Sequence, residues 1–327
     1  MNASSGSHDD QLGRKPIEFR MDFRFVNISS DPNNPKYISI PDPDRYEFIN
    51  KRGKVGWIDK LDERRLFFPI RVVRDMLRRA AEMPLGDLRP LIQSSDAYIL
   101  SRVNAIREGL RIGVWDDDFR NAADEELNAG EATRTRFVIA SIDLVGSTVL
   151  SQNMEPLQYA RLIQTYSREL ARLSALFHGR TLKFMGDGAI LYFPTGSNMR
   201  KHDLAIDCAL SLRDLVLNGI NPVLEESGHP ILACRIGVDS GDAYIMTIGD
   251  SATTNHLDII GQVVNIATKV EKAAPVNGIC FGESVALITH TMWLKYVRRW
   301  QAPSGWPYRN IAGDSAYGVF LLDIPAP

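Results

Sequence analysis

Cysteine is scarce in this sequence, and the three that occur among 327 residues, Cys208, Cys234 and Cys280, lie far apart. An odd number at such spacing argues against a disulfide framework. Buried free thiols in a reducing compartment fit better, and they predict a cytoplasmic location.

An excess of one charge and long apolar runs are also missing. The 38 Lys and Arg residues face 40 Asp and Glu residues, which leaves a formal charge of −2. This balance gives no electrostatic reason to expect nucleic acid as a partner. Apolar runs break within about ten residues, whereas a membrane helix needs roughly 20, and the polar N-terminus lacks the apolar core of a signal peptide. We therefore expect no membrane insertion.

The composition is that of a folded protein, since 44% of the residues are apolar and 24% are charged. These shares exclude disordered and fibrous classes, and the length suits two domains. We divide the chain into a disordered tail over residues 1–15, an N-terminal region of unknown role with a linker over residues 16–130, and a second domain over residues 136–327.

The N-terminal region is expected to be a small α/β unit. Alternating apolar and charged residues predict a strand over residues 17–25, and a short strand follows over 37–40. Helical spacing predicts helices over 70–80 and 91–110, before an acidic linker over 116–135. The second helix is expected to bury one stripe, formed by Leu100, Val103, Ile106 and Leu110. No chemistry is apparent in this region.

The second domain has a clearer order of strands and helices. Strands are predicted over residues 137–143, 180–184, 189–193, 231–239, 242–248, 279–281 and 318–322. Helices are predicted over 156–177, 201–218 and 261–271, and after Glu283. The Ser240-Gly241 pair reads as a hairpin turn between two of these strands. The order β-α-ββ-α-ββ resembles a ferredoxin-like core, so the predicted fold class is α+β.

Two carboxylates follow or end predicted strands beside small residues. Asp143 lies in IDLVGST, and Asp187 lies in the turn of KFMGDG. If the two strands are neighbours, both carboxylates point to one place. Two carboxylates together with substrate phosphates suit hard divalent cations such as Mg²⁺ or Mn²⁺, which in two-metal sites lie roughly 3.5–4 Å apart. Alone, each aspartate would more simply be a helix cap or a turn residue.

Four ordered stretches carry a resemblance to a known family. They are FVIASIDLVGST, TLKFMGDGAILYF, CRIGVDSGDAYIMTIG and LDIIGQVVNIATKVEKAAPVNGICFGES. From Phe137 to the C-terminus the chain is similar to the class III nucleotidyl cyclases, the adenylate and guanylate cyclase catalytic domain. The resemblance implies that a nucleoside triphosphate is converted to a 3′,5′-cyclic nucleotide and pyrophosphate with two divalent cations, Mg²⁺ or Mn²⁺.

The resemblance also implies roles for individual residues. Asp143 and Asp187 match the two metal-binding aspartates, and the carbonyl of Leu144 matches a backbone metal ligand. The loop whose amides bind the triphosphate is matched by Gly146, Ser147 and Thr148.

Further matches lie in the later stretches. Lys183 and Asp258 match the pair that reads the edge of the base, and Asn265 matches the residue that orients the ribose and the reacting phosphate. In the family the metal aspartates and the base-reading pair come from different subunits, so a head-to-tail homodimer with shared active sites is implied. Lys269 stands where the family usually has a catalytic arginine, and it keeps the charge but loses the bidentate fork. Arg309 is a second candidate for contacting the phosphates.

Substrate choice is left open by these motifs. A lysine donor and an aspartate acceptor suit adenine, whose N1 lies beside the 6-amino group, and they also suit cytosine, so ATP is the first expectation and CTP the second. The bacterial antiphage branch of the superfamily, often called Pycsar, makes cyclic CMP or cyclic UMP, and UTP therefore stays open as well. A third possibility is a catalytically weak domain that binds nucleotide for regulation.

Overall fold

The computed structural model describes residues 20–31, 37–51, 54–61, 63–71, 73–74, 89–113, 132–194, 198–250, 254–310, 313 and 315–324. The predicted tail over residues 1–15 lies outside this part of the chain, as do most of the linker and most of the helix expected over 70–80. No helix of the described residues combines the length and apolar character needed to cross a membrane.

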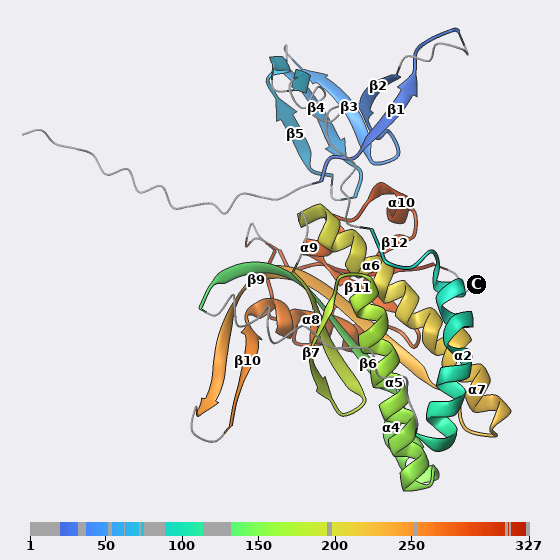
Figure 1. Ribbon diagram of the computed structural model, residues 1–327. Helices are drawn as coiled ribbons and strands as arrows, with labels where there is room; N and C mark the ends of the chain where they lie inside the picture. The colour runs from blue at the N-terminus through green and yellow to red at the C-terminus, as the bar shows by residue number, and fades with distance from the viewer. Residues whose placement is uncertain are drawn as a thin grey trace, which may run out of the picture.

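An eight-stranded sheet forms the centre of the larger body (Figure 1). Its strands run in the order β12-β13-β11-β9-β6-β8-β7, and β10 pairs with β9 beyond this path. The bounds are β6 Arg134–Val145, β7 Arg180–Met185, β8 Gly188–Phe193, β9 Ala233–Asp250, β10 Thr254–Ile260, β11 Ile279–Gly282, β12 Val297–Trp300 and β13 Val319–Leu322. Every pairing is antiparallel except that of β11 with β9.

The ferredoxin-like core predicted from the sequence is confirmed. Helix α5 (Pro156–Leu176) connects β6 to β7, and α6 (Asn198–Asp214) connects β8 to β9. The resulting spatial order β9-β6-β8-β7 places the first strand of the core beside the last, as a split β-α-β arrangement requires. The fold class is therefore α+β.

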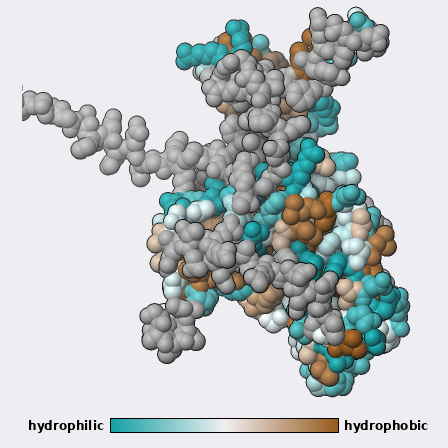
Figure 2. Space-filling view, in the orientation of Figure 1, coloured by the Kyte–Doolittle hydropathy of each residue, from teal (hydrophilic) through white to brown (hydrophobic). Residues whose placement is uncertain are grey.

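Helices cover both faces of the sheet. Side chains of a strand alternate between faces, so Ala140 and Ile142 of β6 pack under α5 and α6, whereas Phe137 and Ile139 pack under α8 (Gln262–Ala273). Burial of both faces explains why β6 reads as an almost continuous apolar run. On the helical side turned to the viewer in Figure 2, hydrophobic residues lie in separate patches among hydrophilic ones.

The N-terminal strands form two small sheets that stand apart from the large one (Figure 1). Strands β1 (Phe23–Asn27) and β2 (Tyr37–Pro41) make one sheet. The other comprises β3 (Tyr46–Lys51), β4 (Lys54–Asp59) and β5 (Arg65–Phe68). The first strand thus begins at Phe23, later than the alternation over residues 17–25 suggested. Strands β3 to β5 were not predicted.

The hairpin predicted at Ser240-Gly241 is wrong. Strand β9 continues through both residues, which pair with Val138 and Phe137 of β6, and neither has a positive φ. The absence of a side chain at Gly241 instead allows α8 to pack closely on β9, because a Cβ there would lie 3.2 Å from Cβ of Val263. The real hairpin of this region joins β9 to β10 further along the chain.

The helix predicted over residues 91–110 is α2 (Ser95–Ile112), and its predicted stripe is partly wrong. The side chain of Ser94 caps the first turn, so the helix begins four residues later than expected. Leu100 is 77% exposed, whereas Tyr98 is buried because its hydroxyl donates to Glu169 of α5 at 3.0 Å. Docking against α5 therefore decided which face of α2 is buried.

The helix predicted over residues 201–218 is longer than expected. After α6 it continues as a π-helix, Leu215–Ile220, and then as α7, Asn221–Glu226. The helix expected after Glu283 is the single turn α9 (Glu283–Ala286), and it is followed by α10 (Thr291–Leu294).

Candidate active site

Asp143 and Asp187 lie close together on neighbouring parts of the sheet. Asp143 is near the end of β6, and Asp187 lies in the tight turn between β7 and β8. Gly188 permits this approach, since a Cβ there would lie 2.9 Å from Oδ1 of Asp143. Burial, and next the negative charge of Asp187, raise the pKa of Asp143. Two like charges thus face each other in a partly buried place.

This carboxylate pair has the character of a cation site. Oδ2 of Asp187 is buried and has no hydrogen-bond partner among the described residues. A buried, unpaired carboxylate oxygen beside a second carboxylate is costly unless a cation neutralises it. The described residues hold no cluster of three or more His, Cys, Asp or Glu side chains suited to a metal. Further ligands would therefore come from the backbone, such as the Leu144 carbonyl, and from phosphate oxygens.

The segment after β6 is open and turns sharply. Gly146 has a φ of 81°, and no other atom lies within 4 Å of where its Cβ would be. Helix α4 (Ser147–Asn153) begins directly afterwards, so the first amides of the helix lack partners within it. Gly146 and Thr148 are exposed and Ser147 is half-buried. The backbone here leaves room for a bulky polar group.

Lys183 and Asp258 form an ion pair although 75 residues separate them. Nζ of Lys183 in β7 lies 2.5 Å from Oδ2 of Asp258 in β10. Oδ1 of Asp258 accepts from the backbone N–H of Ile259 at 2.8 Å, which fixes the carboxylate. The lysine side chain is 37% exposed and that of the aspartate is 11% exposed, so the pair lies at the surface edge of the α8 face. The two residues predicted to read one base are thus brought together.

Asn265 and Lys269 lie four residues apart on α8, and both are exposed. Nζ of Lys269 lies 5.1 Å from the ring centroid of Tyr308, a distance suited to a cation–π contact. The Tyr308 ring packs edge-to-face on Trp306 at 4.8 Å. Lys269 is therefore held by an aromatic side chain.

Arg309 follows Tyr308 directly in the chain. It is exposed, and its backbone bridges to Ala316. Among the described residues, no hydrogen bond or ion pair links the aspartates to the Lys183–Asp258 pair.

Sequence reasoning missed three neighbours of the site. Arg235 pairs with Asp143 across β9 and β6, Glu271 of α8 is buried nearby, and Tyr308 contacts Lys269. Burial, and next the charge of Asp143, raise the pKa of Glu271 to about 7. The aromatic cluster around residues 300–308 was a visible signal for Tyr308. The other two depend on strand register and helix docking, which no local pattern reveals.

The fold is that of a class III cyclase domain. The crystal structure of the adenylyl cyclase CyaB from P. aeruginosa superposes with a TM-score of 0.50 at 18% identity, over 60% of this chain and 96% of that one. The family model of the adenylate and guanylate cyclase catalytic domain matches residues 133–302, more than half of the chain. The chain belongs to this family.

Two curated relatives show how the similarity is distributed. An adenylate cyclase of Anabaena cylindrica is 26% identical over 156 residues, which are 45% of this chain and 29% of that protein. A cytidylate cyclase of Escherichia coli is 24% identical over 171 residues, which are 49% of this chain and 37% of that protein. The chain thus spans about a third of the length of these relatives.

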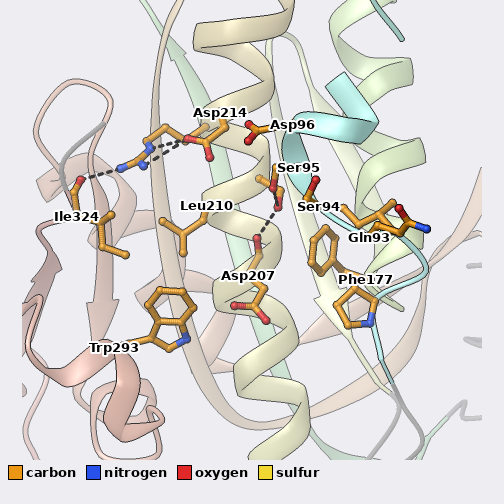
Figure 3. Close-up of a pocket in the computed structure, with 14 residues that line it drawn as sticks. Gln93, Ser94, Ser95, Asp96, Phe177, Asp207, Leu210, Asp214, Trp293 and Ile324 are labelled. Carbon is orange, nitrogen blue, oxygen red and sulfur yellow. Dashed lines mark hydrogen bonds and ion pairs between the residues drawn. The ribbon is translucent and has the colours of Figure 1, made fainter. Parts of the chain in front are cut away.

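Two cavities of the structure lie away from the predicted site residues. One, of about 490 Å³, is an open hollow lined by the start of α2, by α6 and by Trp293 (Figure 3). The other, of about 800 Å³, lies between the N-terminal strands and the segment around α10. None of the residues matched to the cyclase motifs lines either cavity.

Proposed function

We propose that this chain is a nucleotidyl cyclase that converts ATP to cyclic AMP and pyrophosphate. The observation that carries the proposal is the facing pair Asp143 and Asp187, with its buried unpaired oxygen, in a chain of the cyclase family. In the reaction the 3′-oxygen of the ribose loses its proton and bonds to the α-phosphorus. The bond from that phosphorus to the β-phosphate bridging oxygen breaks, and pyrophosphate leaves.

Asp143 and Asp187, with the Leu144 carbonyl, would hold two divalent cations, Mg²⁺ or Mn²⁺. When bound, these ions would lower the pKa of the ribose 3′-hydroxyl and neutralise part of the negative charge of the triphosphate. The raised pKa of Asp143 agrees with a cation site at this position. Two carboxylates that hold a cation repel each other when the cation is not bound.

The remaining residues position the substrate. The amides of Gly146, Ser147 and Thr148 would bind the triphosphate, since the positive φ of the glycine leaves the loop open. Asn265 would orient the ribose, and Lys269 on the same face of α8 would place a positive charge on the phosphate at the transition state. The Tyr308 ring would keep the Lys269 ammonium in place.

The base is read by the Lys183–Asp258 pair in this proposal. Nζ of Lys183 would donate to N1 of adenine, and Asp258 would accept from the 6-amino group. Each residue is already the other's partner at 2.5 Å, so a base must replace both halves of the ion pair. Guanine and uracil present a carbonyl and an N–H at these places, and they would leave both charges unsatisfied.

Cytosine is the second candidate base. Its N3 and 4-amino group present the same acceptor and donor order as adenine, and one of the similar proteins is a cytidylate cyclase. A chain of this kind making cyclic CMP would fit the antiphage role considered from the sequence, whereas cyclic UMP would need other base-reading residues.

Incubation with each of the four ribonucleoside triphosphates and Mn²⁺, followed by identification of the products, tests the choice. We expect the fastest turnover with ATP and the next with CTP, and weaker turnover of GTP and UTP by about 10⁴-fold if the pair is fully desolvated. Faster turnover of GTP or UTP than of both others would refute the role of the pair. The matched variant Asp258→Asn should lose the preference while keeping the fold.

A head-to-tail homodimer is part of the proposal. Large apolar side chains are exposed on the hairpin β9–β10 and on the tip of β7, where the base-reading pair also lies. They are Phe184, Met185, Tyr244, Met246, Ile248 and Ile260. Several large apolar side chains exposed on these elements favour a protein partner. A second copy would cover these residues and bring its Lys183–Asp258 pair toward the aspartates.

A further inference from the structure

The cavity of about 800 Å³ has walls from two parts of the chain. The N-terminal strands contribute Arg24, Lys60 and Leu61, and the segment from α10 to β12 contributes Trp293, Tyr296 and Arg299. Its volume falls in the range of small-molecule sites, which are commonly about 300–1,000 Å³. No motif of the cyclase family lies in its wall, so the cavity needs its own explanation.

Positive charge exceeds negative charge in the wall of this cavity, where five Lys and Arg side chains accompany two acids, Asp42 and Asp44. Arg24 is neutralised by Asp42 at 2.8 Å and Asp44 at 2.5 Å. Lys60 donates to the backbone carbonyl of Pro43 at 2.7 Å and pairs with no acid in the part of the chain that the structure describes. Lys295 and Arg299 have no acidic partner among the described residues. Three cationic side chains, Lys60, Lys295 and Arg299, therefore line the cavity without an acidic partner of their own among the described residues.

Aromatic rings form the other part of the wall. Trp293 and Tyr296 are partly buried, and Phe320 of β13 lies opposite Arg299 in the strand ladder. Rings beside cationic side chains offer stacking for a flat apolar group next to contacts for an anion. The combination points to a ligand with both features.

The two sides of the cavity are fastened together by a buried charge cluster. Arg45 is fully buried, pairs with Asp59 at 3.1 Å and donates to the carbonyl of Thr289 at 2.7 Å. Asp22 accepts from the hydroxyl of Thr291 at 2.6 Å. These bonds hold the N-terminal strands against the segment that leads into α10. The cavity is therefore preformed, which lowers the entropy lost on binding.

We infer that this cavity is a binding site for a phosphate monoester that also contains a flat aromatic ring, such as a nucleoside monophosphate. Three cations without an acidic partner among the described residues suit a group with two negative charges better than a single carboxylate. The guanidinium of Arg299 can bind two oxygens of one phosphate in parallel. The ring would stack against Trp293, because Nζ of Lys295 already lies 4.7 Å from the ring centroid of Tyr296.

The neighbouring cavity is lined by more acids than bases, so the two cavities differ in charge. Trp293 lines both cavities, and the second is lined by Asp96, Asp207 and Asp214 (Figure 3). Of these acids, Asp214 is paired with Arg213 at 3.3 Å. An anion is therefore favoured in the larger cavity over its neighbour.

Calorimetric titration of the full chain in EDTA tests the inference, with AMP, CMP and phenyl phosphate as probes. EDTA removes cation-dependent binding at the aspartate pair. We expect at least one probe to bind to the wild-type chain and inorganic phosphate to bind at least about tenfold more weakly, because it lacks the ring. Arg299→Ala and Lys295→Ala should each weaken binding about tenfold or more.

Arg298→Ala is the matched control. Arg298 is exposed on the same strand but points to the other face, where it pairs with Asp323 at 2.8 Å, so its loss should change affinity by no more than about twofold. Lys183→Ala separates this cavity from the cyclase site and should leave binding unchanged. Binding by none of the probes, equal binding in Arg299→Ala and wild type, or loss of binding in Lys183→Ala would each overturn the inference. Every readout is binding, so the result does not depend on cyclase activity.

Discussion

The Asp143–Asp187 pair places two carboxylates where each weakens the other. Burial and the charge of Asp187 raise the pKa of Asp143, and one oxygen of Asp187 is left without a partner. Such an arrangement costs stability in the free protein, and it becomes favourable when cations are bound. The residues that carry the proposed reaction are thus a source of strain for the fold.

Asp187→Asn should separate these two effects. Removing one charge relieves the repulsion, so we expect an unchanged or higher melting temperature in EDTA. The same variant should lose the stabilisation by Mn²⁺ and slow turnover by about a hundredfold or more, because the cation contribution is worth several kcal/mol. Melting curves and product assays on the same samples measure both.

Glu226→Asn is a suitable control, since Glu226 at the end of α7 forms an exposed ion pair with Arg107 of α2, and neither residue belongs to the cyclase motifs. It should change neither readout. Retention of most of the activity by Asp187→Asn would contradict the metal assignment.

Lys269 of α8 and Tyr308 of the C-terminal segment form a cation–π contact across 39 residues of sequence. Lys269→Ala should lower kcat by about tenfold or more and leave KM nearly unchanged, and Lys269→Arg should match or exceed the wild-type rate. Tyr308→Leu should lower kcat roughly two- to fivefold, the value of an exposed cation–π contact. Tyr308→Phe keeps the ring and should keep the rate. Steady-state kinetics of the four variants test whether Lys269 contacts the phosphate at the transition state. If Lys269 is a surface residue without a role in the reaction, kcat will not change.

Strand β9 carries a buried acid whose ionisation links several elements. Asp239 accepts from the hydroxyl of Tyr317 at 2.6 Å, and that hydroxyl in turn accepts from the amide of Ser284 at the start of α9 at 2.8 Å. Burial raises the pKa of Asp239 to about 7. The group therefore prefers its proton in the folded protein, whereas the unfolded chain loses it near pH 4, about the ordinary value.

The stability that follows from this preference has a definite sign. The stabilisation from the protonated Asp239 is fully present below about pH 4 and is lost as the pH rises through 7. The free energy of unfolding should therefore fall by roughly 1 kcal/mol per pH unit across this window. Asp239→Asn should flatten that part of the dependence while keeping the bond from Tyr317. Urea unfolding at several pH values, compared between the two chains, measures the difference. Parallel curves would show that Asp239 is charged in the folded protein.

The whole chain carries one copy of each half of the proposed site. In the proposed homodimer, the second copy would cover the exposed apolar side chains on β9, β10 and β7. In such a dimer, a subunit that lacks a metal-binding aspartate and a subunit that lacks a functional residue of α8 can together form one intact active site.

Mixing Asp187→Ala with Asn265→Ala should therefore restore activity. A heterodimer has one site with both intact halves and one with neither, so up to about a quarter of the wild-type activity is expected after random exchange, since half of the dimers are mixed and each has one working site. Mixing each variant with itself is the control. Absence of recovery after proven subunit exchange would show that one chain holds a complete site.

Local patterns determined much of this protein. Alternation and helical spacing predicted the strands and helices of the ferredoxin-like core, because backbone periodicity decides which side chains can share a face. The ordered motifs predicted which residues gather at the site. Asp143 and Asp187 could be expected to meet, since a strand end and an adjacent turn bring them together.

Tertiary structure decided what local patterns leave open. Ser240 and Gly241 read as a turn, yet β6 pairs along both and α8 needs the space at the glycine. Leu100 reads as buried, yet contacts of α2 with α5 turned another face inward. The charge cluster around Arg45 and the cavity beside it join segments more than 200 residues apart. Such contacts depend on register and docking between distant elements, whose energy belongs to no single stretch of sequence.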